Sequence, residues 1–202
     1  MAKFDPAYSI VLRLEGGYQN NPADKGNYNS LGDLVGTKYG ISAPVLEQWI
    51  GRPPTKMDMA NLNTHTAKAI YYNLYWKNIQ GDFIRSQDLA NIFFDGHVNH
   101  GRTGIRLMQR VLGVSDDGIV GPITLNALNS SDTGKTYVAY RRTREAFYRQ
   151  LATGSQAQFL NGWLRRLQAF TAYGGLPVAS APAGNATWWI LGLVGLGILI
   201  TR

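Results

Sequence analysis

The chain has 202 residues, of which 45% are hydrophobic and 11% aromatic, so it can bury a sizeable core and is not a disordered chain. Its 20 Lys and Arg against 13 Asp and Glu give a net charge of +7, which favours an anionic partner. The basic residues are too dispersed for a dedicated nucleic-acid reader, and the absence of cysteine excludes disulfides, thiol catalysis and thiolate metal sites.

Apolar residues at three-to-four spacing predict a mainly helical unit over residues 1–173. The predicted helices are 6–15, 42–50, 64–76, 86–100, 103–112, 122–129, 133–152 and 156–172. The Gly/Asn/Asp-rich stretch 18–41 predicts a small hairpin or an ordered loop after the first helix. The N-terminus lacks an apolar core followed by a cleavage site, so we expect no secretory signal peptide.

The first predicted helix ends on one of the three glutamates of the chain. Glu15 follows Tyr8 by seven residues and Val11 by four, so it continues the apolar face of the helix. Gly16 and Gly17 are expected to end the helix in a left-handed cap. A carboxyl group on a buried face, at the negative end of a helix dipole, is difficult to ionise. The sequence therefore predicts an acid that stays protonated near neutral pH.

The composition changes after residue 173. Residues 174–186, GGLPVASAPAGNA, are small and uncharged and are typical of a linker. An uncharged apolar run of 13 residues follows, from Trp188 to Ile200, with a tryptophan pair at one end and Arg202 at the other. The run is short for a membrane span, so a C-terminal core helix is the alternative. The flanking residues favour a membrane anchor.

A protonated carboxylic acid and a second carboxylate are the usual requirements of glycoside hydrolysis. Glu15 fits the acid, and Asp24 and Asp33 lie in the loop that follows it. Either aspartate could position water or stabilise positive charge on a sugar ring. The alternative is that Glu15 caps its helix and the aspartates only form turns.

Several motifs resemble the glycoside hydrolase family 108 N-acetylmuramidases of the lysozyme-like superfamily. They are EGGY from Glu15, the loop with Asp24 and TKYGI from Thr37, YYNLYW at 71–76, and FFDGHVNHG at 93–101. Residues 107–128 resemble the predicted peptidoglycan-binding half of that family. The loop is longer than the family pattern and lacks its double glycine.

The resemblance implies a set of functional residues and requires no cofactor or metal. The implied catalytic residues are Glu15 as the acid, Asp24 and Thr37, and the implied substrate-binding residues are Tyr18, Asp33, Tyr39, Asp95 and Asn99. Asp33 is the alternative to Asp24, and Ser30 is the alternative to Thr37. His97 and His100 could suggest a zinc amidase, but no third ligand stands out, and we expect a partly exposed histidine pair. Asp95 and Asn99, at (i, i+4), are expected to pair within their helix.

The fold class expected from the resemblance is mainly α, of the α+β lysozyme-like type. We expect a helical bundle with a small hairpin or loop insertion after the first helix and an apolar C-terminal helix. Residues 1–102 would form the catalytic region and 103–173 a peptidoglycan-binding-like helical region packed on it. Residues 174–186 would be the linker and 187–202 the anchor.

The function implied is hydrolysis of the β-1,4 bond between N-acetylmuramic acid and N-acetylglucosamine of bacterial peptidoglycan. With its anchor, the enzyme would be membrane-associated and act on the host wall, in phage lysis or in virion entry, including from a virion membrane. Alternatives are a lytic transglycosylase that uses the same acid, a non-enzymatic wall-binding membrane or virion protein, and a metal-dependent amidase. The sequence leaves the oligomeric state open.

Overall fold

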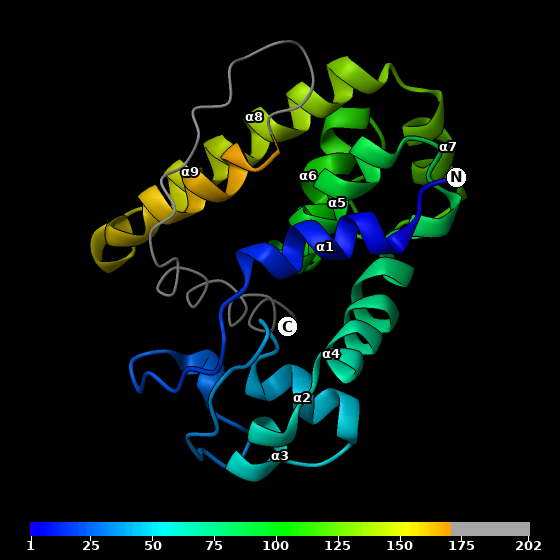
Figure 1. Cartoon of the computed structure of the whole chain (residues 1–202). Helices are drawn as coiled ribbons and strands as arrows, with labels where there is room; N and C mark the ends of the chain where they lie inside the picture. The colour runs from blue at the N-terminus through cyan, green and yellow to red at the C-terminus, as the bar shows by residue number, and fades with distance from the viewer. Residues whose placement is uncertain (171–202) are drawn as a thin grey trace.

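A computed structural model describes residues 1–170 of the chain. Helix α5 lies at the centre of the fold (Figure 1). The described helices are α1 (Phe4–Leu14), α2 (Ala43–Ile50), α3 (Lys56–Asn61), α4 (Thr64–Tyr71), α5 (Gln87–His100), α6 (Arg102–Leu112), α7 (Pro122–Ser130), α8 (Thr133–Leu151) and α9 (Leu160–Gln168). Short 3-10 segments occupy Lys25–Asn27, Lys77–Ile79, Gly81–Phe83 and Gly154–Phe159, and a π-helical turn, Tyr72–Trp76, continues α4.

The central position of α5 follows from its apolar surface. The helix is buried from Leu89 to His100, apart from Asn91, and α1, α6 and α8 pack around it. A helix that is apolar on most of its circumference has to be enclosed by other elements. Helix α9, the last described helix, lies along α8 (Figure 1).

Two glycines allow α5 and α6 to approach closely. A Cβ atom on Gly104 would lie 2.3 Å from the carbonyl oxygen of Gly96, and one on Gly96 would lie 2.0 Å from the hydroxyl of Tyr140. The hydroxyl of Tyr140, on α8, fills this position and donates to the Gly104 carbonyl at 2.9 Å. The three helices therefore meet at a point where no larger side chain fits.

The stretch after α1 forms an ordered loop in the described structure. Three isolated antiparallel bridges cross it, Gln19 to Thr37, Tyr28 to Leu34 and Lys38 to Ile41, without a named strand among the described residues. Of the two alternatives predicted for 18–41, the ordered loop is therefore the one found. This loop lies with α2 and α3 at one end of the molecule, away from α8 (Figure 1).

The predicted helices correspond to described ones, with three corrections. The prediction for 64–76 merges α4 with the π-helical turn, and 156–172 merges the last 3-10 segment with α9. Helix α3 was missed, although Thr55 and Asp58 form a capping box at its start. Helix α1 ends at Leu14, and Glu15 is an extended cap residue with φ −92°. Gly16 and Gly17 do not adopt positive φ, so the predicted left-handed cap is wrong.

The aromatic residues of 71–76 belong mainly to the core. Tyr71 and Trp76 are buried, and Phe4 on α1 packs against both Tyr72 and Trp76.

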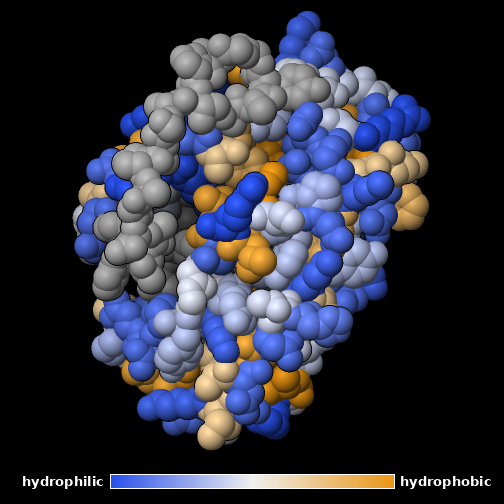
Figure 2. All heavy atoms as spheres, in the orientation of Figure 1, coloured by the Kyte–Doolittle hydropathy of each residue, from blue (hydrophilic) through white to orange (hydrophobic). Residues whose placement is uncertain are grey.

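The face seen in Figure 2 is mostly hydrophilic, with apolar side chains gathered near its centre.

The linker and the apolar C-terminal helix predicted for 174–202 lie outside the described residues. Within residues 1–170, no helix has both the length and the apolar character needed to cross a membrane.

Candidate active site

Glu15 occupies the point where α1 gives way to the loop. Its backbone N–H still donates to the carbonyls of Val11 and Leu12, so the helix fixes its position, while its extended ψ turns the chain out of the helix. The side chain is 2% exposed. Its environment is therefore set by residues that fold against it.

The two carboxyl oxygens of Glu15 have different surroundings. Oε1 accepts a hydrogen bond from Nη1 of Arg166 at 3.1 Å. Oε2 is buried and has no hydrogen-bond partner among the described residues. A buried oxygen without a donor is unfavourable when it carries charge, but it is readily accommodated when it carries a proton. The geometry therefore marks Oε2 as the oxygen that holds the proton.

Burial raises the pKa of Glu15 above its ordinary value of 4.5. The charge and the hydrogen bond of Arg166 lower this pKa, and the nearby charge of Asp95 raises it. The net direction is upward, because removing a carboxylate from water outweighs the pairing with one arginine that is itself shared. A raised pKa is the property that a general acid needs.

Arg166 is shared with Asp95 of α5. The guanidinium donates to Oδ1 of Asp95 through Nε at 2.8 Å, and Arg144 of α8 donates to Oδ2 at 2.6 Å. The side chains of Asp95 and Arg144 are both 0% exposed. Burial alone would raise the pKa of Asp95, but the two arginines hold it below its ordinary value. Asp95 therefore stays ionised and fixes Arg166 beside Glu15.

Gly40 lies directly against the unpaired oxygen of Glu15. A Cβ atom on Gly40 would lie 2.4 Å from Oε2 and 2.4 Å from the hydroxyl of Tyr71. That hydroxyl donates to the carbonyl of Tyr39 at 3.1 Å, which leaves Oε2 without this donor. Gly40 has a φ of +72°, a conformation that suits glycine. The absence of a side chain at this position thus leaves room for the carboxyl group of Glu15 and the hydroxyl of Tyr71.

A second polar cluster is centred on Asn27, which is 0% exposed. Its Oδ1 accepts from Gln19 Nε2 at 2.7 Å and from the hydroxyl of Thr37 at 2.8 Å. Asp24 joins the cluster through a longer contact of its Oδ2 with Gln19, at 3.4 Å, and its Oδ1 accepts from the N–H of Gly26 at 2.9 Å. Burial raises the pKa of Asp24, although these hydrogen bonds lower it.

Asp24 and Thr37 are thus brought together, while Asp33 and Ser30 lie elsewhere in the loop. Asp33 is exposed, and its Oδ2 accepts from Asn29 at 3.2 Å. The backbone N–H of Ser30 donates to Glu47. In the part of the chain that the structure describes, no hydrogen bond or ion pair joins Glu15 directly to Asp24 or Thr37. The loop segment 37–40 connects the surroundings of Glu15, which include Gly40, with the Asn27 cluster, which includes Thr37.

The remaining predicted residues have defined structural contacts. The hydroxyl of Tyr18 donates to the Val35 carbonyl at 3.1 Å, and its ring is 44% exposed. Tyr39 has a φ of +51°, and the ammonium of Lys38 lies 5.3 Å from its ring centroid. The amide of Asn99 donates to the Asp95 carbonyl oxygen at 2.7 Å, which confirms the predicted pairing within the helix.

The prediction of a partly exposed histidine pair is wrong, because α5 is enclosed on all sides. His97 and His100 are each only 5% exposed. His100 packs against the rings of Phe147 and Tyr148, and both of its nitrogens lack hydrogen bonds among residues 1–170. The described residues contain no group of three His, Asp or Glu side chains that could hold a metal ion.

A carboxyl group whose pKa is raised by burial, beside a loop that carries a second carboxylate, is the constellation of a glycoside hydrolase. Residues 8–101 match the family model described as glycosyl hydrolase 108, and residues 103–168 match the model described as a predicted peptidoglycan domain. The first part of the chain is therefore a glycosyl hydrolase 108 domain, and the second part is a predicted peptidoglycan domain.

A solved structure supports this assignment. SagA of Brucella abortus is similar with a TM-score of 0.72 and 27% sequence identity, over 83% of this chain and 90% of that chain. No curated protein matches the sequence. The chain is therefore a glycoside hydrolase that acts on peptidoglycan.

Sequence reasoning missed Arg166, which contacts Glu15 from 151 residues further along the chain. It also missed Gln19 and Asn27, which hold the Asp24 cluster together. Arg166 lies in the pattern WLRRLQ, where it follows Trp163 by three residues and precedes Leu167. A charged residue next to two apolar ones on a helix was the available signal, but the pattern gives no partner for it.

Proposed function

We propose that the enzyme is an N-acetylmuramidase that hydrolyses the β-1,4 bond between N-acetylmuramic acid and N-acetylglucosamine. The observation that carries the proposal is Oε2 of Glu15, which is buried, free of hydrogen bonds among the described residues and packed directly against Gly40. A proton on this oxygen can pass to the leaving glycosidic oxygen without first breaking a hydrogen bond.

In the proposed reaction, Glu15 donates its proton to the leaving oxygen as the bond to the sugar carbon breaks. A water molecule attacks the oxocarbenium-like carbon and gives a proton to Asp24, after which the two carboxyl groups return to their starting states through solvent. Asp24 is favoured over Asp33 because it shares a cluster with Thr37 and its Oδ2 makes only the 3.4 Å contact. The hydroxyl of Thr37 already donates to Asn27, so Thr37 would hold the water as an acceptor.

The substrate-binding residues in this proposal are of two kinds. Tyr18, Tyr39 and Asp33 lie on the loop, where they would contact the glycan. Asp95 and Asn99 are buried beneath Glu15, so they would act on the substrate through Arg166 rather than by touching it.

The site of action is also a proposal. The apolar run 188–200 with its tryptophan pair and Arg202 supports anchoring in a membrane, and the positive net charge supports contact with an anionic wall and bilayer. An anchored muramidase would act on the host wall, in phage lysis or in virion entry.

The test is digestion of purified peptidoglycan by the full chain, wild type beside Glu15→Gln, with the products read by mass spectrometry. Fragments with reducing N-acetylmuramic acid ends are expected from the wild type and not from the variant. General acid catalysis contributes roughly 10²–10⁴ in rate, so the variant should lose activity on that scale. Anhydro ends would instead indicate a lytic transglycosylase. If the folded wild type leaves the glycan intact, the enzyme proposal fails.

A further inference from the structure

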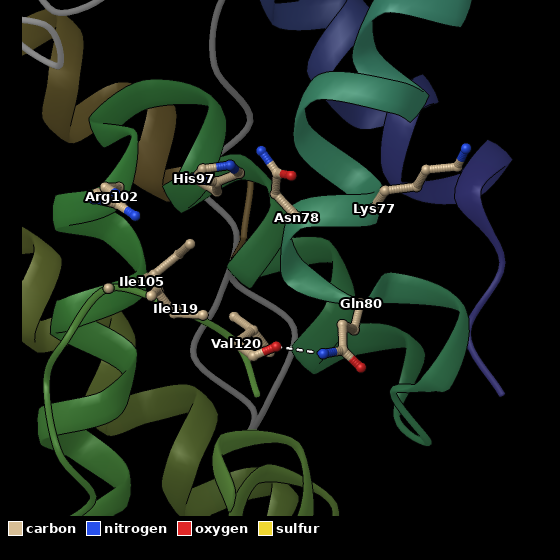
Figure 3. A pocket seen from close by; sticks show the side chains of 9 residues that line it. Lys77, Asn78, Gln80, His97, Arg102, Ile105, Ile119 and Val120 are labelled. Atoms are coloured by element: carbon tan, nitrogen blue, oxygen red, sulfur yellow. Dashed lines mark hydrogen bonds between the residues drawn. The ribbon is translucent and has the colours of Figure 1, made fainter. Parts of the chain in front are cut away.

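A pocket of about 320 Å³ lies between the segment after the π-helical turn, helices α5 and α6, and the turn that follows α6 (Figure 3). Its lining includes Asn78, Gln80, His97, Arg102, Ile105 and Ile119. Asn78, Gln80 and His97 belong to the part that matches glycosyl hydrolase 108, whereas Ile105 and Ile119 belong to the predicted peptidoglycan domain. The pocket therefore lies where the two parts of the chain meet.

The turn that closes the pocket is held by one buried glutamine. Gln109 donates to Asp117 Oδ1 at 2.8 Å and to the Ile119 carbonyl at 3.0 Å, and it accepts from the N–H of Gly118 at 2.8 Å. Gln80 from the other side of the pocket donates to the carbonyl of Val120 (Figure 3). The wall is therefore built by specific hydrogen bonds, which makes the pocket a defined cavity.

His97 lines this pocket and has one ring nitrogen without a hydrogen bond among the described residues. Its Nδ1 lies 2.9 Å from the carbonyl oxygen of Gly101, so Nδ1 carries the hydrogen. Nε2 is buried and has no hydrogen-bond partner in the described structure. Burial lowers the pKa of His97, and this outweighs the raising effect of the nearby Gly101 and Leu74 backbone. The neutral ring therefore offers a lone pair at Nε2 that requires an N–H or O–H donor.

The other polar groups repeat this pattern. Asn78 donates to the Leu74 carbonyl at 2.6 Å and Gln80 donates to Val120, so each retains a side-chain oxygen that accepts nothing among residues 1–170. The side chain of Arg102 is directed toward the pocket (Figure 3), and no described hydrogen bond or ion pair uses its guanidinium. Lys77 points away, since its ammonium donates to Asn73.

The charges around Arg102 leave it available for an anion. The charge of Arg102 contributes to lowering the pKa of Asp117, so this carboxylate lies within its electrostatic reach. Oδ1 of Asp117 already accepts from Gln109 and from the N–H of Ile119. A ligand carboxylate would thus add a direct partner for Arg102.

The apolar lining distinguishes a peptide from a sugar. Ile105 and Val120 are buried, and Ile119 is 56% exposed at the rim. These are branched aliphatic side chains, and no aromatic ring other than the imidazole of His97 lines the pocket within the described residues. Sugar faces commonly stack on aromatic rings, whereas methyl groups pack well on isoleucine and valine.

We propose that this pocket binds the peptide portion of peptidoglycan. A carboxylate of the peptide would pair with Arg102, amide N–H groups would donate to His97 and to the oxygens of Asn78 and Gln80, and small methyl side chains would pack against Ile119. The proposal rests on peptidoglycan being the substrate and adds the part of it that is recognised.

The position of the pocket relative to the catalytic acid agrees with such a substrate. The ring of Tyr75 lies 5.6 Å from the ring of His97, and burial and then the charge of Glu15 raise the pKa of Tyr75. Tyr75 is therefore near both Glu15 and His97 of the pocket wall. Glycan at Glu15 and its attached peptide in the pocket would both lie close to this side chain.

The binding test uses the full chain carrying Glu15→Gln, so that no glycan is cleaved. The ligand is a soluble acidic stem peptide without sugar, and its binding is measured by calorimetry. Adding Arg102→Gln should weaken binding at least about tenfold, because a charge-assisted hydrogen bond is lost. Arg142→Gln on α8, which is exposed and outside the pocket, is the matched control and should leave binding unchanged. Ile119→Trp, at the exposed rim, should also weaken binding by filling the pocket.

Three binding outcomes would overturn the proposal. They are no peptide binding by the folded chain, equal binding by the Arg102→Gln variant, and Arg102-dependent binding of a peptide-free glycan oligomer in place of the peptide.

An activity test separates this proposal from the function itself. With Glu15 intact, Arg102→Gln should slow digestion of whole peptidoglycan and leave digestion of glycan strands stripped of their peptides unchanged. Equal slowing on both substrates would contradict recognition of the peptide. If the wild type cuts neither substrate, the hydrolase proposal fails, while the calorimetric result still reports on the pocket.

Discussion

Arg166 donates to Glu15 across 151 residues of sequence and from the other matched part of the chain. Glu15 ends the first helix of the glycosyl hydrolase part, and Arg166 lies on α9, near the end of the predicted peptidoglycan domain. The second part therefore supplies the one described side chain that hydrogen-bonds to the carboxyl group of Glu15, the proposed catalytic acid.

Replacing Arg166 should change the pH range of the enzyme. In Arg166→Gln, the positive charge that lowers the pKa of Glu15 is lost, while burial and Asp95 still raise that pKa. Glu15 would then stay protonated to a higher pH, so the alkaline fall of kcat/KM should move upward. The measurement is a pH profile of kcat/KM with Arg165→Gln as control, since Arg165 is the exposed neighbour on the same helix. An unchanged or lowered alkaline limb would show that Arg166 does not tune Glu15.

Gly40→Ala should inactivate the enzyme without unfolding it. The new methyl group would lie 2.4 Å from Oε2 of Glu15, and a displacement of the catalytic group by about 1 Å can cost roughly 10² in rate. Gly51→Ala is the matched control, because Gly51 has the same φ of +72° but no atom within 4 Å of the added carbon. Both variants should lose similar stability from backbone strain, measured by thermal unfolding. Equal activity in the Gly40→Ala and Gly51→Ala variants would exclude a special role for the close packing of Gly40 against Glu15.

Asp24 and Asp33 can be separated by paired substitutions. Asp24→Asn should lower kcat by at least about 10², as expected when a general base is removed. Asp33→Asn should change kcat little, since Asp33 is exposed and contacts Asn29 rather than the Thr37 cluster, and the loss of its glycan contact should appear in KM. The rates are measured on peptidoglycan at the optimum pH of the wild type. A larger loss in Asp33→Asn would transfer the role to Asp33.

Features of the site that depend on one helix could be predicted from the sequence, whereas contacts between helices could not. The periodicity of α1 placed Glu15 on a buried face and predicted a raised pKa, which the structure confirms in direction. The (i, i+4) spacing predicted the contact of Asp95 with Asn99, since both lie on one helix. Local spacing cannot show which helices pack together, so the two arginines that reach Asp95 from α8 and α9 were not predictable. For the same reason, the histidines of α5 were predicted to be partly exposed and are buried.

The buried pair of Asp95 and Arg144 should be important for stability. Arg144→Met removes one partner of a fully buried ion pair and should cost about 3–5 kcal/mol, because Asp95 loses a neutralising charge. Arg149→Gln breaks an exposed pair with Glu145 on the same helix and should cost less than about 1 kcal/mol. Chemical denaturation of the full chain measures both values. Similar losses of unfolding free energy in the two variants would mean that the buried pair stabilises the fold no more than the exposed pair does.

The same pair gives a pH dependence of stability. The pKa of Asp95 is lowered in the folded state from its ordinary value of 3.8. Its contribution is therefore complete above that value and is lost as the pH falls through the folded pKa. Acid unfolding of the wild type should begin below pH 4 for this reason, and Asp95→Asn should remove that part of the acid transition.

The ion pair between α1 and α9 also limits how this enzyme can be recombined with others. A chimaera that keeps residues 1–101 and takes its second part from an unrelated wall-binding module would lose Arg166, and with it the partner of Oε1. Only a replacement module that delivers a guanidinium to the same point would preserve the pairing of the catalytic acid. Fusion at residue 102 would also remove α6 and α8, which enclose α5, so the hydrolase part cannot be exchanged as an independent module.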